Sequence, residues 1–403
     1  MQSYHNFVLA ALLLAGSTTT LNADEPIRRT GGQTEQGLSA AVTVADRSLL
    51  HTSQLFPYSA DETIETGNLQ GQFELLLSNL DRVLQHRGAS RSDVVKLNFY
   101  VASAEIANFV RARLGKSFPA DALPAVSYVQ TRLPYEEADV ALDAIVAVEP
   151  LASDRVEHVR IDGLDARDFQ SSYSVMPLGD AVYVAGQAQK GELAEATTDT
   201  LAGLLRTLRH LWLDREHIAE VKCFLDPMTE IETVDERIAA FFGDAPVPPV
   251  SHVEWIAGSL PIEIELVVFA PAKDSTDTIE IFTPPWMKSS PVFSRVTRLY
   301  GNRRIYLSGL YASKPGDGES EVRDLFASMK TILADHGSDF RHLAKATYYV
   351  STADASSKLN QLRPEFYDPA RPPSASKAMV KGVALPERGI TIDMIAAPDP
   401  TDQ

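Results

Sequence analysis

Charged residues near one strand and one turn in the second half of the sequence are the best candidates for chemistry. Glu263 lies in a Glu-x-Glu segment of an apolar stretch, and Arg371 and Lys377 flank the turn Pro373-Ser-Ala-Ser376. A carboxylate in such a strand can act as a general acid or base toward a bound molecule, or it can pair with a basic side chain across an interface. A basic side chain beside the turn can bind a carboxylate, or it can be an ordinary solvated charge.

Other common chemistries leave no pattern in this sequence. The nine histidines include no His-x-x-x-His pair, and the single cysteine, Cys223, cannot belong to a Cys-x-x-Cys motif, so a zinc site is not indicated. The sequence contains no Walker loop, no G-x-G-x-x-G turn and no G-x-S-x-G elbow. We therefore expect neither a metal nor a cofactor, and we expect Cys223 to be a small buried core residue.

A pattern that occurs three times must position these residues. Each copy has a long amphipathic helix, a strand centred on a lysine, a second short helix, a Pro-x-x-Ser turn and an apolar strand. The turns end at Ser127, Ser251 and Ser376, which are about 125 residues apart, the length of a whole small domain. Three equal modules in one chain predict a covalently linked pseudo-trimer.

Apolar periodicity predicts the elements of each module. Helical spacing covers residues 69–85, 201–212 and 322–334, and a glycine follows the first and the third of these segments. In the strand at 94–101, Val95, Leu97, Phe99 and Val101 point to one face, and Lys96, Asn98 and Tyr100 point to the other. We expect α+β modules, each a mixed β-sheet with two helices on one face, while the other face meets something less apolar.

Composition limits the partners and the location of the protein. The net charge of −17 disfavours nucleic acid, because binding a phosphate backbone requires many Lys and Arg side chains. Residues 7–15 form an apolar run that resembles the core of a secretory signal peptide at 1–23, with cleavage expected after Ala23. No other stretch approaches about 20 apolar residues, so we expect no membrane insertion and an exported protein, periplasmic or secreted.

Several of these segments together resemble the RidA/YjgF family of reactive-intermediate deaminases. The string VYVAGQAQ at 182–189 and the Pro-x-x-Ser turn leading to LPIEIELVVFA make module 2, residues 156–272, the best match. Module 1, residues 38–150, has HTSQLFPY in place of the Ser-Gly-Gln turn of the family, and module 3, residues 278–398, has YLSGLY. The resemblance implies a chorismate-mutase-like fold, a trimer and ligand clefts between neighbouring modules. One chain would supply all three modules and would be monomeric.

The resemblance also implies a chemistry, the hydrolysis of imino acids without a metal or cofactor. In the family an arginine in Pro-x-Arg-Ser binds the substrate carboxylate with two parallel hydrogen bonds, and a glutamate positions and activates water. The arginine position corresponds here to Val126, Val250 and Ala375. The glutamate position corresponds to Ala141, Glu263 and Thr391. No module keeps both residues, and none keeps the arginine.

Further cleft residues follow from the same resemblance. An asparagine of the second helix that faces the cleft corresponds to Arg111, Asp235 and Asn360. The turn that lines the cleft through its backbone corresponds to Gly186 and Gln187 in module 2 and to Ser308 and Gly309 in module 3. Arg111, Arg371 and Lys377 are the candidates to replace the missing positive charge.

Three functions remain open on this reading. The first is non-covalent binding of a small metabolite, a carboxylate or an imine, in one or two inter-module clefts. The second is a deaminase-type hydrolase acting on 2-iminobutanoate or 2-iminopropanoate, with a rebuilt site and Glu263 as the group that handles water. The third is a structural or partner-binding scaffold, in which Val126, Val250 and Ala375 simply pack. The ribonuclease activity described for some members of the family is disfavoured by the acidic composition.

Overall fold

The helices form where the apolar spacing predicts them, two in each module. The structure is a computed structural model that describes residues 25–61, 63–164, 169–256 and 258–399; the expected signal peptide lies outside these residues. The helices are α1 (Leu69–Arg87), α2 (Ala104–Leu114), α3 (Leu193–His210), α4 (Ile231–Phe242), α5 (Gly318–Asp335) and α6 (Ala353–Phe366). As predicted, a glycine ends α1: Gly88 adopts the left-handed conformation, with φ 73°.

Helix α3 departs from the predicted bounds at both ends. It begins at Leu193, eight residues earlier than expected, because after Leu193 its first two turns bury only Ala196, Thr197 and Thr200, which give no strong apolar pattern. Thr197 is fully buried and donates its hydroxyl to the Leu193 carbonyl at 2.6 Å. The helix ends before Trp212, whose left-handed φ of 61° corresponds to that of Gly337 after α5, so the predicted end was two residues too late.

The strands form three mixed six-stranded sheets with one common order. Sheet I is β5-β4-β6-β3-β8-β7, sheet II is β11-β10-β12-β9-β14-β13, and sheet III is β17-β16-β18-β15-β2-β1. The bounds are β1 Ile27–Thr30, β2 Ala41–Val44, β3 Ser48–Thr52, β4 Val94–Val101, β5 Ala125–Gln130, β6 Val140–Val148, β7 Glu157–Val159, β8 Tyr173–Met176, β9 Asp180–Gln187, β10 Ile218–Leu225, β11 Val250–Glu254, β12 Ile262–Ala270, β13 Ile279–Phe282, β14 Val296–Leu299, β15 Arg304–Leu307, β16 Leu343–Val350, β17 Ser374–Met379 and β18 Ile390–Ala396.

Each sheet combines strands from two sequence repeats. The first two strands of a repeat join the sheet of the preceding repeat, and the chain then crosses to its own sheet through residues 45–47, 177–179 or 300–303. The exchange is cyclic, because β2 of the first repeat pairs antiparallel with β15 of the third. The ring is therefore closed by hydrogen bonds within one chain, which confirms the intramolecular pseudo-trimer.

The first hairpin is also held by side chains. Arg28 donates to the carbonyl of Asp335 at 2.6 Å, and the His336 ring bridges the hydroxyls of Thr30 and Thr43 at 2.5 and 2.6 Å. These contacts join both strands of the hairpin to the end of α5.

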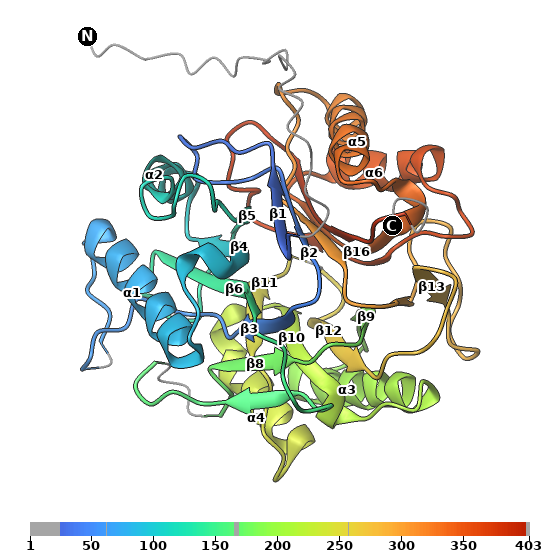
Figure 1. Cartoon of the computed structure of the whole chain (residues 1–403), viewed down its shortest axis with the longest axis horizontal. Helices are drawn as coiled ribbons and strands as arrows, with labels where there is room; N and C mark the ends of the chain where they lie inside the picture. The colour runs from blue at the N-terminus through green and yellow to red at the C-terminus, as the bar shows by residue number, and fades with distance from the viewer. Residues whose placement is uncertain (1–24, 62, 165–168, 257, 400–403) are drawn as a thin grey trace.

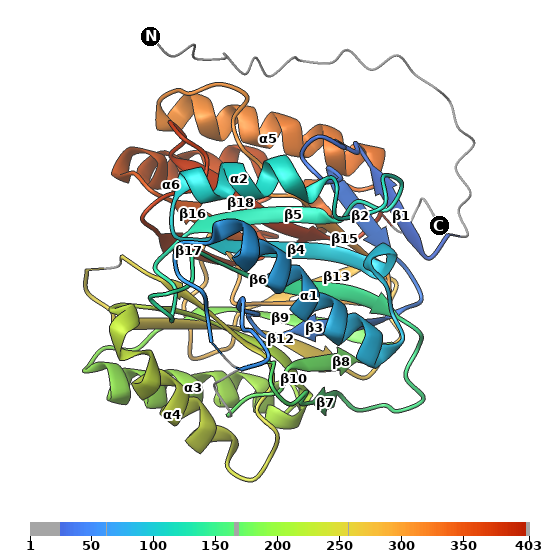
Figure 2. The ribbon, with the colours of Figure 1, turned by 90° about the vertical axis from the view of Figure 1, so that its left-hand side faces the viewer.

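The helices lie on the outside of the molecule, one pair over each sheet (Figure 1). Seen from the side, the strands of the three sheets fill the space between the helix pairs (Figure 2). Leu97, Phe99 and Val101 of β4 face the helices, as predicted. Val95 does not: it lies in the apolar cluster shared by all three sheets, because a β-bulge between Val94 and Lys96 reverses the alternation there. No helix in the described ranges is long and apolar enough to cross a membrane.

The inner faces of the sheets meet in layers along the pseudo-axis. One layer is apolar and one is aromatic, the latter including Tyr100, Phe224 and Tyr349. Between them lies a ring of ion pairs, each joining two sheets: Lys96 to Asp393 at 2.7 Å, Lys345 to Glu265 at 2.7 Å and Lys222 to Asp143 at 3.8 Å. A cavity of about 30 Å³ lies among these residues, enough for one or two water molecules. The ring is the less apolar surface expected behind each sheet.

Candidate functional site

Each Pro-x-x-Ser segment was predicted as a turn, but it leads directly into a strand, β5, β11 or β17, which contains its serine. Each of these strands lies beside the end of a strand from another sheet. At the β5–β15 junction, the Val126 amide donates to Ser308 Oγ at 2.7 Å. At the β3–β11 junction, the Gln54 amide donates to the Val250 carbonyl at 3.4 Å. At the β9–β17 junction, the Gly186 amide donates to Ser376 Oγ at 3.1 Å. These three junctions are where inter-module clefts were expected.

At the β5–β15 junction Arg111 contacts an aromatic ring and a backbone carbonyl. The guanidinium of Arg111 lies 4.3 Å from the centre of the Tyr128 ring and donates to the Ala384 carbonyl at 2.8 Å. Val126 is 1% exposed and belongs to the core of module 1. Thr391, at the glutamate position, donates to the Leu310 carbonyl at 2.9 Å. Arg111 therefore holds protein groups, and no carboxylate replaces the missing glutamate.

The predicted turn residues of this junction serve its backbone. Ser308 Oγ donates to the Ser39 carbonyl at 2.6 Å, and the Gly309 amide donates to the Val126 carbonyl at 2.9 Å. Their polar groups hold the two modules together.

The β3–β11 junction is closed by a different pair. His252 Nε2 lies 3.1 Å from Asp235 Oδ1, and both residues are buried. Val250, at the arginine position, is fully buried, and Ala141, at the glutamate position, lies in the aromatic layer. The helix residue and the strand residue of this junction thus contact each other.

The β9–β17 junction keeps a carboxylate. Glu263, on β12, is partly buried against Gly186, where an added Cβ would lie 2.0 Å from Glu263 Oε1. Glycine is required at this place because any side chain would occupy the position of the glutamate. Ser376 also hydrogen-bonds to Glu263, which ties the carboxylate to β17.

Two cations face this carboxylate. Lys377 follows Ser376 on β17, and its Nζ donates to Ser356 on α6 at 2.9 Å. Arg295 precedes β14, and its carbonyl accepts the Ala185 amide at 2.9 Å, one residue before Gly186. Both act electrostatically on Glu263. The arginine position holds Ala375, whose side chain is smaller than the valines of the other junctions.

The electrostatics give Glu263 acid–base character near neutral pH. Burial, and next the charge of Glu265, raise the pKa of Glu263 to about 7, against the opposing effects of Ser376, Arg295 and Lys377. Burial lowers the pKa of Lys377 and of Arg295. A glutamate with this pKa can hold a proton or release it at physiological pH, as a general acid or base must.

The structure separates the predicted site residues. Glu263, Gly186 and Lys377 come together, whereas the Gln187 side chain donates to Thr207 Oγ1 of α3 at 3.0 Å. Asn360 is exposed on α6 and accepts from Arg363 at 2.5 Å.

One predicted candidate lies elsewhere, and one participant was missed. Arg371 donates to the Ile279 carbonyl at 3.1 Å, on β13 of sheet II, and takes no part in the Glu263 group. Arg295 was not predicted, because in sequence it opens module 3, and only the exchange of strands between sheets brings it beside Gly186.

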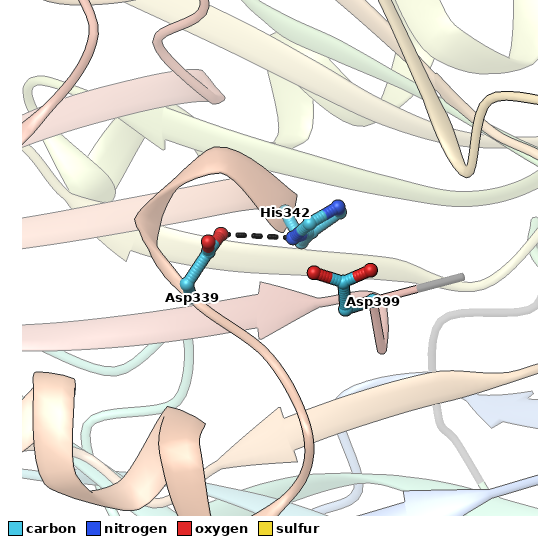
Figure 3. A group of neighbouring side chains, drawn as sticks. All are labelled: Asp339, His342 and Asp399. Carbon is cyan, nitrogen blue, oxygen red and sulfur yellow. Dashed lines mark hydrogen bonds and ion pairs between the residues drawn. The ribbon is translucent and has the colours of Figure 1, made fainter. Parts of the chain in front are cut away.

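A further cluster of ligand-type side chains is explained by a turn. Asp339, His342 and Asp399 place one ligand atom each within 4.8 Å of one another (Figure 3). Asp339 caps the short 3₁₀ helix η4 (Phe340–His342) and accepts from His342 Nδ1 at 2.8 Å. Module 2 has the same Asp-x-x-His cap at Asp214 and His217. The cluster therefore has a structural explanation, and we assign no metal to it.

Fold and junctions define a chain of three chorismate-mutase-like modules joined around a pseudo-threefold axis. The family model described as endoribonuclease L-PSP matches residues 33–148. This match covers the first module, and the common strand order of the three sheets shows that the same type of module is repeated in tandem along the chain.

Solved structures match about a third of this chain each. A YjgF-family protein from Neisseria meningitidis is 23% identical, covers 30% of this chain and 95% of its own, and has a TM-score of 0.23. The Rid-family protein YyfB from Yersinia pestis is 24% identical over 31% of this chain and 100% of its own, with a TM-score of 0.26. The yeast protein YEO7 is 27% identical over 28% of this chain and 86% of its own, with a TM-score of 0.24. No curated protein matches this chain.

Proposed function

We propose that this protein binds a small carboxylate-bearing metabolite, a keto or imino acid, at the β9–β17 junction. One observation supports this choice. Among the three junctions in the described ranges, the β9–β17 junction alone combines a carboxylate at the family's glutamate position, Glu263, with a basic residue two positions after the missing arginine, Lys377. The corresponding residues Tyr128 and His252 are each engaged by their own helix.

The physical argument concerns charge. Lys377 and Arg295 place two positive charges near one glutamate in a partly buried setting, where an electrostatic interaction is stronger than in water. Both cations can attract a ligand carboxylate. The carbonyl or imine carbon of the ligand would then be directed toward Glu263. No metal or cofactor enters this proposal.

Imine hydrolysis is a second candidate, favoured by the pKa of Glu263 near 7. Protonated Glu263 would give its proton to the imine nitrogen, forming an iminium ion. As the oxygen of water bonds to carbon, the C=N π electrons move to nitrogen and Glu263 takes a proton from the water. The resulting carbinolamine moves its hydroxyl proton to nitrogen, and as the C–N bond breaks a C=O bond forms, which gives the 2-oxo acid and ammonia. Export of the protein remains part of the proposal, supported by the apolar run at 7–15 alone.

Thermal unfolding tests the binding proposal. A ligand that binds only the folded state raises the melting temperature. At a ligand concentration 100 times the dissociation constant, the free energy of unfolding increases by about 2.7 kcal/mol. We expect 2-oxobutanoate to stabilise the wild type and the variant Lys381→Met, whose side chain is exposed, but not Lys377→Met. An equal shift in all three proteins would contradict the assigned site, and no shift in the wild type would contradict the proposed function.

Ammonia release from 2-iminobutanoate separates the two candidates. Hydrolysis predicts that the wild type releases ammonia faster than the uncatalysed reaction and that Glu263→Ala does not, whereas binding alone predicts no acceleration by either protein. If neither binding nor release is observed, the scaffold alternative gains support.

A further inference from the structure

We propose that a carboxylate ligand enters the β9–β17 junction together with one proton, which Glu263 takes up. This inference rests on the proposed function and adds control by pH to the same site. It concerns the state of the protein in the complex, and therefore holds whether the ligand is only bound or also hydrolysed.

The arrangement of charges in the free protein is the starting point. Glu263 hydrogen-bonds with Ser376 of β17, and it is influenced electrostatically by Glu265 of its own strand, by Arg295 from the segment before β14 and by Lys377 of β17. Glu265 is already paired with Lys345 of the axial ring at 2.7 Å. The negative charge of Glu263 is therefore compensated chiefly by Lys377 and Arg295.

A ligand carboxylate changes this balance, because it is attracted by the same two cations. An ionised Glu263 would then share its cations and gain a second negative neighbour besides Glu265. When two carboxylates occupy one site, the pKa of one of them rises strongly, because both cannot ionise without mutual repulsion. Since the ligand carboxyl is the stronger acid, the proton goes to Glu263.

Glycine at position 186 keeps Glu263 in place for this role. An added Cβ there would lie 2.0 Å from Glu263 Oε1, so the carboxyl group packs directly on the backbone of β9. The amide of Gly186 is directed to Ser376 Oγ at 3.1 Å and not to the carboxylate. The hydroxyl of Ser376 can donate to an ionised Glu263 or accept from a protonated one, so protonation requires no rearrangement of the strands.

The pH dependence follows with a definite sign. The pKa of Glu263 in the free protein is about 7, so below pH 7 the site already holds the proton, and above pH 7 it must acquire one on binding. The affinity for a carboxylate should therefore be constant at acidic pH and fall about tenfold for each pH unit above 7. A neutral ligand should show no such fall.

Calorimetry of the whole chain with 2-oxobutanoate measures the proton directly. At one pH, the observed enthalpy changes with the ionisation enthalpy of the buffer in proportion to the number of protons taken up. We expect uptake of about 0.9 proton at pH 8 and about 0.1 at pH 6. In Glu263→Gln uptake should disappear and affinity should no longer depend on pH. The control Glu236→Gln, at an exposed position of α4, should behave like the wild type.

The outcomes are distinct. Binding without proton uptake at pH 8, or equal uptake by the wild type and Glu263→Gln, would overturn this inference and leave the proposed function intact. Absence of binding at pH 6, where no proton has to be acquired, would overturn both. If Glu263→Gln does not fold, the dissociation constant of the wild type between pH 6 and pH 9 decides alone, because a flat profile contradicts the inference.

Discussion

At the scale of single residues, the three modules differ at the second residue after Val126, Val250 and Ala375. Tyr128 lies under Arg111, His252 pairs with Asp235, and Lys377 reaches Ser356. In the first two pairs the strand residue contacts a residue of the second helix of its own module. Only the third leaves a cation to act on a carboxylate from another sheet, so asymmetry between the junctions arises from a few side chains on a common backbone.

The sequence predicted part of this site. The resemblance to the family predicted that Glu263 occupies the glutamate position and that no module keeps the arginine, and Lys377 was a candidate because it flanks the Pro-x-x-Ser segment. Arg111 was predicted near a junction and lies at one, but its cation–π contact with Tyr128 could not be foreseen from a pattern that gives no distance between a helix and a strand. Arg295 was missed because it belongs in sequence to a different module from its neighbours.

Glu263 should limit stability at alkaline pH. An ordinary glutamate has a pKa of about 4.3 when unfolded, and that of Glu263 in the folded protein is about 7, so the fold disfavours the ionised form. Glu263 therefore does not lower the free energy of unfolding below pH 4, and its destabilising effect grows as the pH rises from 4 to 7. Glu263→Gln should stabilise the protein by up to about 3 kcal/mol at pH 8 and have little effect at pH 4, measured by urea unfolding.

The exposed control Glu236→Gln should show no comparable dependence on pH. Equal effects of Glu263→Gln at pH 4 and pH 8, or destabilisation at pH 8, would be inconsistent with a protonated glutamate in the fold.

At the scale of elements, the lysine at the centre of each second strand is explained by another sheet. The repeat showed that Lys96, Lys222 and Lys345 occupy equivalent places, but not their purpose. Their partners Asp143, Glu265 and Asp393 each lie on a strand of a different sheet, so local periodicity carries no information about the pairing. The inward direction of the lysines was predictable; the ring that they form was not.

Replacing one partner of an ion pair in this ring should destabilise the protein more than replacing both partners. Lys345→Met would leave Glu265 buried without its partner, a change that typically costs about 3–5 kcal/mol. The double variant Lys345→Met/Glu265→Leu should recover much of that loss, because a buried ion pair can be replaced by apolar residues. Urea unfolding of the two variants measures the difference.

A surface pair supplies the matched control. Lys358 donates to Glu319 at 2.9 Å on the helices of the same module, and Lys358→Met should have little effect. If the double variant were less stable than Lys345→Met, the ring would contribute more than charge compensation.

At the scale of the whole molecule, the repeat predicted three modules and their closure into a pseudo-trimer, and both are confirmed. The exchange of strands between sheets was not predicted. The apolar alternation of a strand is the same whether the strand joins the sheet of its own module or that of a neighbouring module. The connections at 45–47, 177–179 and 300–303 are also no longer than ordinary turns, so their length does not reveal the exchange.

Closure by β1 and β2 makes the first hairpin essential to the state of association. In the intact protein, sedimentation should show the mass of one chain, since sheet III is completed from within. Deleting residues 25–45 should expose the edge of β15 and cause concentration-dependent association, because an unpaired edge strand recruits other strands.

A protein that lacks only residues 1–24 is the control and should remain monomeric. An obligate trimer of whole chains would contradict a ring that closes on itself.

The pairing of β2 with β15 also determines when sheet III can be completed during synthesis of the chain. About 260 residues separate Val44 from Arg304, with which it pairs. At about 5–20 residues per second, the ribosome needs roughly 13–52 s to make them. Throughout that interval the β1–β2 hairpin has no β15 to pair with, so the nascent protein carries an unpaired strand edge until β15 has been made. Premature termination anywhere before β15 would leave that edge permanently available to other chains.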